Sequence, residues 1–297
     1  MTEFLQHVVN GVSLGTIYAL IALGYTMVYG VLKLINFAHG DVYMASAFAG
    51  FYIATAVGVR QHPTTGKAIL VFAGAMAICG LLGAAIERFA YRPLRGRPRL
   101  TALITAIGVS FLLEYGFQLP SLRTQGRAME EALRGLGVRV PGWLGALVGR
   151  LPESFPPGPT PRFFPEPFER VDWTVLGGVH LSNYDVVSLL VAVAFMLGLQ
   201  LVVYRTRFGT AMRAVSFLPE TAALQGINSN LVYLFTLAAG TALAGIAGAL
   251  IAPTYGMSTS MGTNVIWTVM LMCMLGGMDS LLGAVVGGLI IGQILSF

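Results

Sequence analysis

The feature that most constrains this chain is a series of long segments that contain no charged residue. These segments cover residues 4–32, 42–59, 68–86, 100–113, 186–204, 221–278 and 280–297. A helix needs about 20 apolar residues to cross the hydrocarbon core of a bilayer. Only 10% of the residues are charged, whereas an ordinary soluble domain has about 25%. The chain is therefore predicted to be an all-α polytopic membrane protein rather than an enzyme with a soluble active site.

The apolar segments predict about eight transmembrane helices. Residues 221–278 are too many for one crossing, and we expect Pro253 and the turn residues after it to divide them. The seventh span is short, so a re-entrant segment is the alternative for it. The expected spans are 10–32, 42–59, 67–87, 100–119, 184–204, 231–252, 263–277 and 280–297.

Basic residues between the spans predict the orientation of the chain in the membrane. The loop 88–99 contains five arginines and no acid, and three more arginines follow the fifth span. Cytoplasmic loops carry an excess of Lys and Arg, and two helices separate these loops, so both can face the cytoplasm. The arginines are Arg88, Arg92, Arg95, Arg97 and Arg99 in the first loop, and Arg205, Arg207 and Arg213 in the second.

This orientation divides the chain into three parts. Residues 1–120 are expected to hold the first four transmembrane helices, with the N-terminus outside. Residues 121–182 are expected to form an extracytoplasmic Pro-rich insert. Residues 183–297 then hold the last four helices, with a cytoplasmic loop at 205–229.

The insert is the one long polar stretch of the chain. Eight of the 14 prolines fall in it, most densely between residues 152 and 167. Proline fixes φ and removes a backbone donor, so extended structure is expected, with a short helix around 127–135. The insert is either a docking surface for an external partner or a tolerated surface insertion.

Several functions are excluded by what the sequence lacks. The net charge of +5 comes from basic residues between apolar runs and not from a basic face, which argues against nucleic-acid binding. The chain contains neither a GxxxxGK[ST] nor an HExxH motif. It therefore has no P-loop with which to hydrolyse ATP itself, and no metal site is predicted.

Polar residues inside the apolar segments, or in the short link between the first two, are the candidates for a translocation path. Asn36, His39 and Asp41 lie between the first two spans with almost no loop around them. They form either a broken-helix element near the path or a tight cytoplasmic turn, with Asp41 satisfying free N–H groups of the second span. Glu114 is the only carboxylate well inside a span, and the sequence offers it no partner.

Small residues at helical spacing mark two stripes near the C-terminus. One stripe contains Gly240, Ala244 and Gly248, and the other contains Ala284, Gly288 and Gly292. Small side chains let helix backbones approach closely. We expect packing within the chain, with a subunit interface or a pore wall as the alternative.

The polar stretch 205–230 predicts a short helix on the cytoplasmic face. Pro219 suits a first helical position, Glu220 complements the helix dipole, and Gly226 can end the helix. A short exposed helix is well shaped to sit in a groove of a cytoplasmic partner.

The short stretch 220–226 resembles the E-A-A-x-x-x-G coupling-loop motif of bacterial ABC importer permeases. The matching residues are Glu220, Ala222, Ala223 and Gly226. Thr221 stands in place of the first alanine, and the downstream I-x-L-P of the motif does not occur. Four longer stretches resemble the branched-chain amino acid permease family of the Liv type. They are GYTMVYGVLKLINFAHGD at 24–41, ERFAYRPLRGRPRLTALITAIGVSFLL at 87–113, RAVSFLPETAALQGIN at 213–228 and LGGMDSLLGAVVGGLIIGQ at 275–293.

This resemblance implies a permease of the bacterial inner membrane that works with several partners. They would be a second permease (a related chain or another copy), two cytoplasmic ATP-binding subunits and an external substrate-binding protein. ATP and Mg would bind to the ATPase subunits, and this chain would bind no cofactor. The coupling residues implied are Arg213, Pro219, Glu220, Ala222, Ala223 and Gly226.

Leucine, isoleucine and valine are the substrates that the resemblance favours, with urea or short amides as the alternative. An ion-coupled secondary transporter would need paired intramembrane carboxylates, and a scaffold without transport is a third hypothesis. The insert is longer than we expect for the family. Family members also usually continue beyond the position of Phe297 with another hydrophobic segment and a basic tail, which would place a native C-terminus inside.

Overall fold

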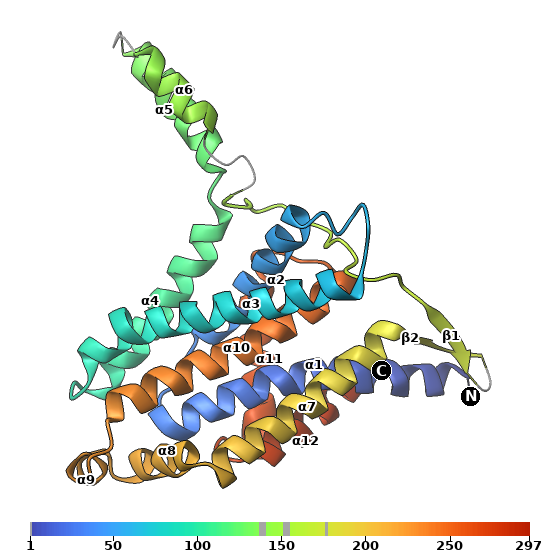
Figure 1. The fold of residues 1–297 in the computed structure, drawn as a ribbon, viewed down its shortest axis with the longest axis vertical. Coiled ribbons are helices and arrows are strands. Elements are labelled where there is room, and N and C mark those ends of the chain that lie inside the picture. The colour runs from blue at the N-terminus through green and yellow to red at the C-terminus, as the bar shows by residue number, and fades with distance from the viewer. Residues whose placement is uncertain (1, 137–140, 151–154, 176–177) are drawn as a thin grey trace.

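A computed structural model describes residues 2–136, 141–150, 155–175 and 178–297 of the protein. The described residues are mainly helical (Figure 1). The helices are α1 (Thr2–Leu32), α2 (Ala38–Ala56), α3 (Thr65–Ile86), α4 (Arg99–Gln118), α5 (Leu122–Gly135), α6 (Gly142–Arg150), α7 (Asn183–Arg205), α8 (Arg207–Phe217), α9 (Pro219–Leu224), α10 (Ser229–Tyr255), α11 (Met261–Gly276) and α12 (Leu281–Ser296). A π-helix η1 (Glu87–Tyr91) and a 3₁₀ turn η2 (Arg92–Leu94) extend α3, and β1 (Asp172–Val175) pairs antiparallel with β2 (Val179–Ser182).

The long helix α1 lies at the centre of the bundle. It packs along α12 and α10, and it also contacts α7 and α11. Most of α1 beyond its first turns is buried, and its last two-thirds contain no charged residue. In a helix that is apolar all round, the contact faces are selected by side-chain size rather than by amphipathic periodicity.

Both small-residue stripes pack within the chain, which confirms that expectation. A Cβ atom on Gly292 would lie 2.4 Å from the Cα atom of Gly15, and one on Gly240 would lie 2.7 Å from the carbonyl oxygen of Gly24. Real side chains do not approach backbone atoms this closely. Glycine is therefore needed where α12 and α10 touch α1.

We expect the Gly292→Val variant to separate α12 from α1 and to destabilise the protein by about 1–3 kcal/mol, the usual effect of overpacking. Gly108, which has no atom within 4 Å of an added Cβ atom, provides the matched control as Gly108→Val. Thermal unfolding of both purified variants in detergent measures the difference. Equal melting temperatures would show that the α1–α12 contact is not tight.

The predicted spans agree closely with the helices. Five helices are long and apolar enough to cross a membrane: α1, α4, α7, α10 and α3 with its extension to Leu94. The helices α11 and α12 are apolar but shorter, and α2 has 19 residues. Eight crossings thus remain a prediction. The long run is divided at the turn residues after Pro253, as expected: α10 continues through Pro253 to Tyr255 and ends at Gly256, where φ is 74°.

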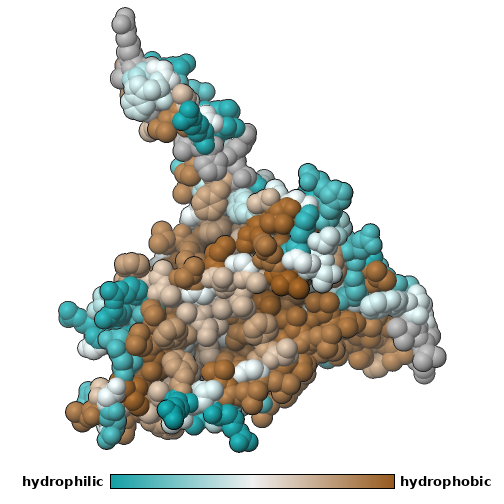
Figure 2. Space-filling model, in the orientation of Figure 1, coloured by the Kyte–Doolittle hydropathy of each residue, from teal (hydrophilic) through white to brown (hydrophobic). Residues whose placement is uncertain are grey.

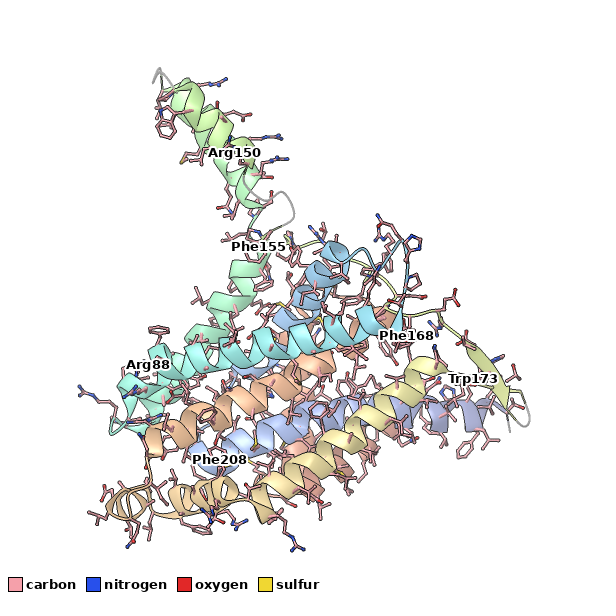
Figure 3. The ribbon with its side chains drawn as sticks, in the orientation of Figure 1. Arg88, Arg150, Phe155, Phe168, Trp173 and Phe208 are labelled. Atoms are coloured by element: carbon pink, nitrogen blue, oxygen red, sulfur yellow. The ribbon has the colours of Figure 1, made fainter. Side chains whose placement is uncertain are left out.

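The insert contains more helix than its prolines predict. The expected short helix is longer, Leu122–Gly135, and a second helix, Gly142–Arg150, was missed. The two helices form a hairpin that projects from the end of α4, and Phe155 marks where the chain returns to the bundle (Figures 1 and 3). Both helices lie outside the part of the insert where prolines are dense, so no proline interrupts their backbone hydrogen bonds. Pro152 lies outside the described residues.

The Pro-rich part of the insert that follows, residues 155–171, contains no helix, as expected. It is tied to the bundle, because Phe164 is 6% exposed among core residues that include Phe48 and Met257. The backbone of Arg162 also exchanges two hydrogen bonds with that of Met257, at 2.9 and 3.1 Å. This part of the insert is therefore a component of the core.

The surface of the bundle is apolar between polar ends. Large hydrophobic side chains of α4 and α7 are exposed, among them Phe111, Leu112 and Leu190. In the face drawn in Figure 2, hydrophobic residues cover the middle of the bundle and hydrophilic residues collect at its two ends and on the projecting hairpin. This distribution is typical of a protein surrounded by lipid.

Candidate functional site

The segment between α1 and α2, residues 33–37, is non-helical, and polar residues in it and in the first turn of α2 are buried. Asn36 is 1% exposed and its Oδ1 atom accepts a hydrogen bond from the Tyr91 hydroxyl at 2.6 Å. His39 is fully buried, with its ring edge-on to the ring of Tyr25 at 5.7 Å between centroids. The broken-helix element near the path and the tight cytoplasmic turn both stay predictions for this segment.

Lys33, the first residue after α1, lies at the surface. It has a φ of 51°, uncommon for a residue with a side chain. Its Nζ atom lies 2.8 Å from Oδ1 of Asp279, in the turn between α11 and α12. Both side chains are substantially exposed, so this ion pair positions the turn more than it stabilises the fold.

The tertiary structure brings the two candidate carboxylates to one junction of α2, α4 and α11. Asp41 accepts a hydrogen bond from the Ser110 hydroxyl of α4, and Glu114 lies one turn further along α4. Oε2 of Glu114 accepts a hydrogen bond from the Thr263 hydroxyl of α11 at 2.9 Å. Ser110 and Glu114 are four residues apart in α4, so the contacts of both carboxylates lie along one face of that helix.

Glu114 does have a partner, and the sequence could not show it because Thr263 lies on α11, far away in the chain. Asp41 lies in the first turn of α2, whose N-cap residue Phe37 makes no side-chain cap hydrogen bond. The helices can meet so closely because Gly40 faces Gly262, where a Cβ atom on Gly40 would lie 2.3 Å from the Gly262 carbonyl oxygen.

The junction holds acids but lacks the composition of a metal centre. Among the described residues, no group of three or more His, Cys, Asp and Glu side chains could hold a metal ion. Oδ1 of Asp41 has no hydrogen-bond partner there, although Asp41 is only 1% exposed. A buried carboxylate oxygen of this kind can accept a hydrogen bond from a cationic or polar solute.

The polar stretch after α7 forms the two short helices α8 and α9, as local sequence predicts for α9. Pro219 begins α9, Glu220 lies in its first turn, and Gly226 follows it with a φ of 81°. Ala222 is 5% exposed and faces the bundle, whereas Glu220, Ala223 and Gly226 are exposed. Exposed apolar side chains flank them: Phe217, Leu218 and Leu224, the last 87% exposed.

Arg213 lies apart from this exposed surface. Its guanidinium donates a 2.5 Å hydrogen bond to the Val203 carbonyl oxygen and stands 5.7 Å from the centre of the Tyr204 ring. Arg213 therefore fastens α8 to the end of α7, where it also complements the free carbonyl groups of that helix.

The two basic loops meet at one end of the bundle, as the orientation argument requires. Arg95 forms an ion pair with Glu87, which is 1% exposed, and donates a hydrogen bond to Asn230 at the start of α10. Its guanidinium also stacks over Tyr233, 4.4 Å from the ring centre. Figure 3 places Arg88 at this end and Phe168 and Trp173 at the other.

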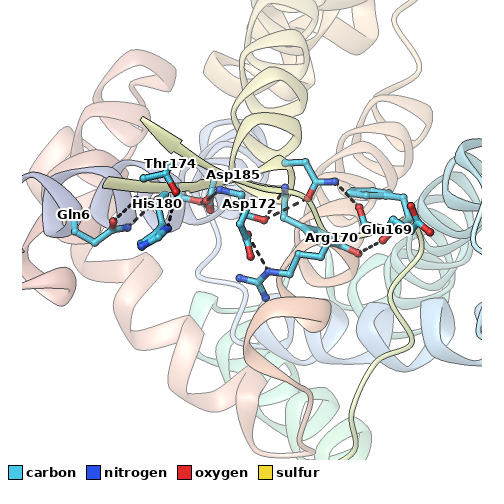
Figure 4. A network of polar contacts seen from close by, with 12 residues as sticks. Gln6, Glu169, Arg170, Asp172, Thr174, His180 and Asp185 are labelled. Atoms are coloured by element: carbon cyan, nitrogen blue, oxygen red, sulfur yellow. Dashed lines mark hydrogen bonds and ion pairs between the residues drawn. The ribbon is translucent and has the colours of Figure 1, made fainter. Parts of the chain in front are cut away.

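A polar network lies at the opposite end (Figure 4). The side chain of Gln6 exchanges two hydrogen bonds with the backbone of His180, so the β-hairpin is fixed to the start of α1. Asp185 accepts hydrogen bonds from the Ser13 hydroxyl at 2.5 Å and from the Ser182 N–H at 2.9 Å. The second bond belongs to the capping box that begins α7. No sequence pattern marks this network, because its members come from segments more than 150 residues apart.

These features define a class: a multi-pass helical membrane protein with a polar break and an acidic junction among its helices and short exposed helices at one end. The family model for the permease component of branched-chain amino acid transport systems matches residues 7–297. The chain belongs to this family of branched-chain amino acid transport permeases.

The similar proteins cover nearly the whole chain. The high-affinity branched-chain amino acid transport system permease protein BraD of Pseudomonas aeruginosa is 34% identical over 98% of this chain and 84% of its own length. The corresponding LivH protein of Escherichia coli K12 is 36% identical over 97% and 84%. A probable LivH of Methanocaldococcus jannaschii is 24% identical over 92% and 74%. No solved structure matches the chain.

Proposed function

We propose that this chain is a transmembrane permease subunit of a bacterial ABC importer for branched-chain or related amino acids, in the inner membrane. It works with a second permease (a related chain or another copy), two cytoplasmic ATP-binding subunits and an external substrate-binding protein. ATP and Mg bind to the ATPase subunits. The observation that carries this proposal is membership of the permease family together with an exposed helix, α9, on the basic end of the bundle.

The surface formed by α8 and α9 is suited to receive motion from an ATPase. The exposed apolar side chains Phe217, Leu218 and Leu224 suit a groove on a partner, and Glu220 adds a charge beside them. Arg213 and Ala222 link this surface to α7 and the bundle. Closure of the ATPase pair would thus displace α8 and α9 and, through them, the ends of α7 and α10. The excess of arginine at this end supports a cytoplasmic location and an external N-terminus.

The broken element and the acidic junction are the proposed walls of the path. Asn36, His39, Asp41 and Glu114 are intramembrane polar residues, which mark substrate pathways in membrane proteins. The proposed substrates are branched-chain amino acids, because the similar proteins are named as permeases for them. Urea and short amides are the alternative substrates.

A secondary transporter is the second candidate, and one observation favours it. Asp41 and Glu114 lie at one junction of helices, which supplies two intramembrane carboxylates of the kind that ion or proton coupling requires. Family membership argues against this candidate. Uptake that persists when a protonophore dissipates the ion gradient, but stops when ATP is depleted, would eliminate it.

The proposed assembly is tested by purifying the tagged chain from its native cell in mild detergent and identifying the proteins that accompany it. We expect a P-loop ATPase and a second permease, both lost when Gly226 is replaced by leucine. Gly108→Leu is the matched control, since an added Cβ atom at Gly108 meets no other atom. Recovery of the wild-type chain alone, stable and intact, would contradict the importer assignment.

A further inference from the structure

A cavity of about 300 Å³ opens at the end of the bundle opposite α9, beside the polar network of Figure 4. Its walls come from the first half of α1, the β-hairpin, the start of α7 and the end of α10. Sites for small molecules usually have volumes of about 300–1,000 Å³, so this cavity suits a ligand the size of one amino acid. The residues that line the cavity include Ile17, Arg170, Asp172, Tyr184, Asp185 and Leu250.

The rim of the cavity carries both signs of charge. Arg170 lies in a single long contact with Asp172, 3.3 Å between Nε and Oδ1, and both side chains are about half exposed. The remaining guanidinium nitrogens of Arg170 have the geometry that binds a carboxylate through two hydrogen bonds. Asp185 accepts one hydrogen bond on each oxygen, and a carboxylate has lone pairs for further donors.

The floor of the cavity is apolar. Ile17 is 4% exposed, Leu250 is 3% exposed, and Tyr184 is 7% exposed. Aliphatic surface placed on such a floor leaves water, which favours binding. The cavity therefore offers a cation, anions and a hydrophobic wall within the dimensions of one small molecule.

The walls are held in place without a ligand. Gln6 fixes the hairpin to α1 through the two hydrogen bonds with His180. The Tyr184 ring stacks on Phe168 at 4.3 Å, and its hydroxyl donates a hydrogen bond to the Phe168 carbonyl oxygen at 3.1 Å. A preorganised site loses less entropy when it binds.

We propose that this cavity, the external vestibule, binds one zwitterionic aliphatic amino acid at the entrance to the permease. Arg170 holds the substrate carboxylate, Asp172 and Asp185 hold the ammonium group, and Ile17 and Leu250 contact the aliphatic side chain. This inference rests on the proposed function and adds an entry site with its recognition chemistry. It places the first contact of the substrate with this chain far from the acidic junction.

The test measures binding of radiolabelled leucine to the purified permease assembly in nanodiscs, with no substrate-binding protein present. We expect Arg170→Gln to weaken leucine binding about tenfold or more, since the charged hydrogen bonds to the carboxylate are lost. Leucinol, which has the ammonium group and side chain but no carboxylate, should compete equally well in wild type and variant. Arg127→Gln, an exposed arginine of α5, is the matched control and should bind leucine as wild type does.

A second variant tests the apolar floor. Leu250→Trp fills the cavity and should abolish binding of leucine and leucinol alike. Co-purification of the ATPase shows whether this variant still assembles, so a folding defect is distinguished from a blocked site. If Leu250→Trp fails to assemble, Arg170→Gln decides the proposal alone.

Two outcomes would overturn the proposal. Leucine binding equal to wild type in Arg170→Gln would remove the carboxylate site. If Arg170→Gln keeps wild-type leucine binding but weakens the binding of added substrate-binding protein to the nanodiscs in a separate assay, the vestibule is a protein contact instead. The proposed function fails separately, by absence of the ATPase from the wild-type assembly.

Discussion

Replacing Gly226 with leucine is expected to abolish amino-acid uptake while the protein remains folded in the membrane. Gly226 follows α9 with a φ of 81°, and an added Cβ atom there would meet no other atom. Conformation rather than space is therefore the constraint, because the left-handed region costs a residue with a side chain about 1–2 kcal/mol. Leucine would move this backbone toward negative φ and turn α9 away from its position between α8 and α10.

The controls for this prediction use residues of the same surface. Gly226→Asn should retain most uptake, since asparagine adopts positive φ more readily than leucine. Glu220→Arg should abolish uptake by reversing the charge in the exposed first turn of α9, without altering the backbone. Uptake of labelled leucine by cells is compared with the amount of folded permease in their membranes. Normal uptake in both Gly226→Leu and Glu220→Arg would remove the coupling assignment from α9.

Replacing Arg95 with alanine is expected to cause the largest loss of stability of any single change at the basic end. Glu87 is buried, and Arg95 is its ion-pair partner. Breaking a buried ion pair by removal of one partner destabilises a protein by about 3–5 kcal/mol, because a charge is left unpaired. We expect the lower end of that range, about 3 kcal/mol, since 29% of the Arg95 side chain is exposed.

A double variant separates the unpaired charge from lost packing. Glu87→Gln combined with Arg95→Ala should recover much of the stability, because no buried charge remains. Arg97→Ala, in the same loop but exposed, should change stability little. Denaturation of the purified wild type and the three variants measures the free energy of unfolding of each. If the double variant were no more stable than Arg95→Ala, packing of Arg95 on Tyr233 would be the main contribution instead.

Local features of this protein could be predicted from the sequence. The long apolar helices coincide with the charge-free runs because a segment that crosses lipid must satisfy its own backbone hydrogen bonds, and this requirement acts within one segment. The helix α9 could also be predicted because its signals are local: Pro219, Glu220 and Gly226 act on the turn that contains them. The helix Gly142–Arg150 was not predicted, because extended structure was expected for the whole insert although its prolines are dense only in one part of it.

Contacts between distant segments were decided only by the tertiary structure. Glu114 looked isolated in the sequence, but in the structure it accepts a hydrogen bond from Thr263 of α11, and Ser110, one turn away on α4, donates one to Asp41 of α2. The external vestibule likewise draws its walls from both halves of the chain. The physical reason lies in the helices themselves. Because they are apolar all round, hydrophobic periodicity does not indicate which face turns inward, and close contacts such as Gly15 with Gly292 make that choice.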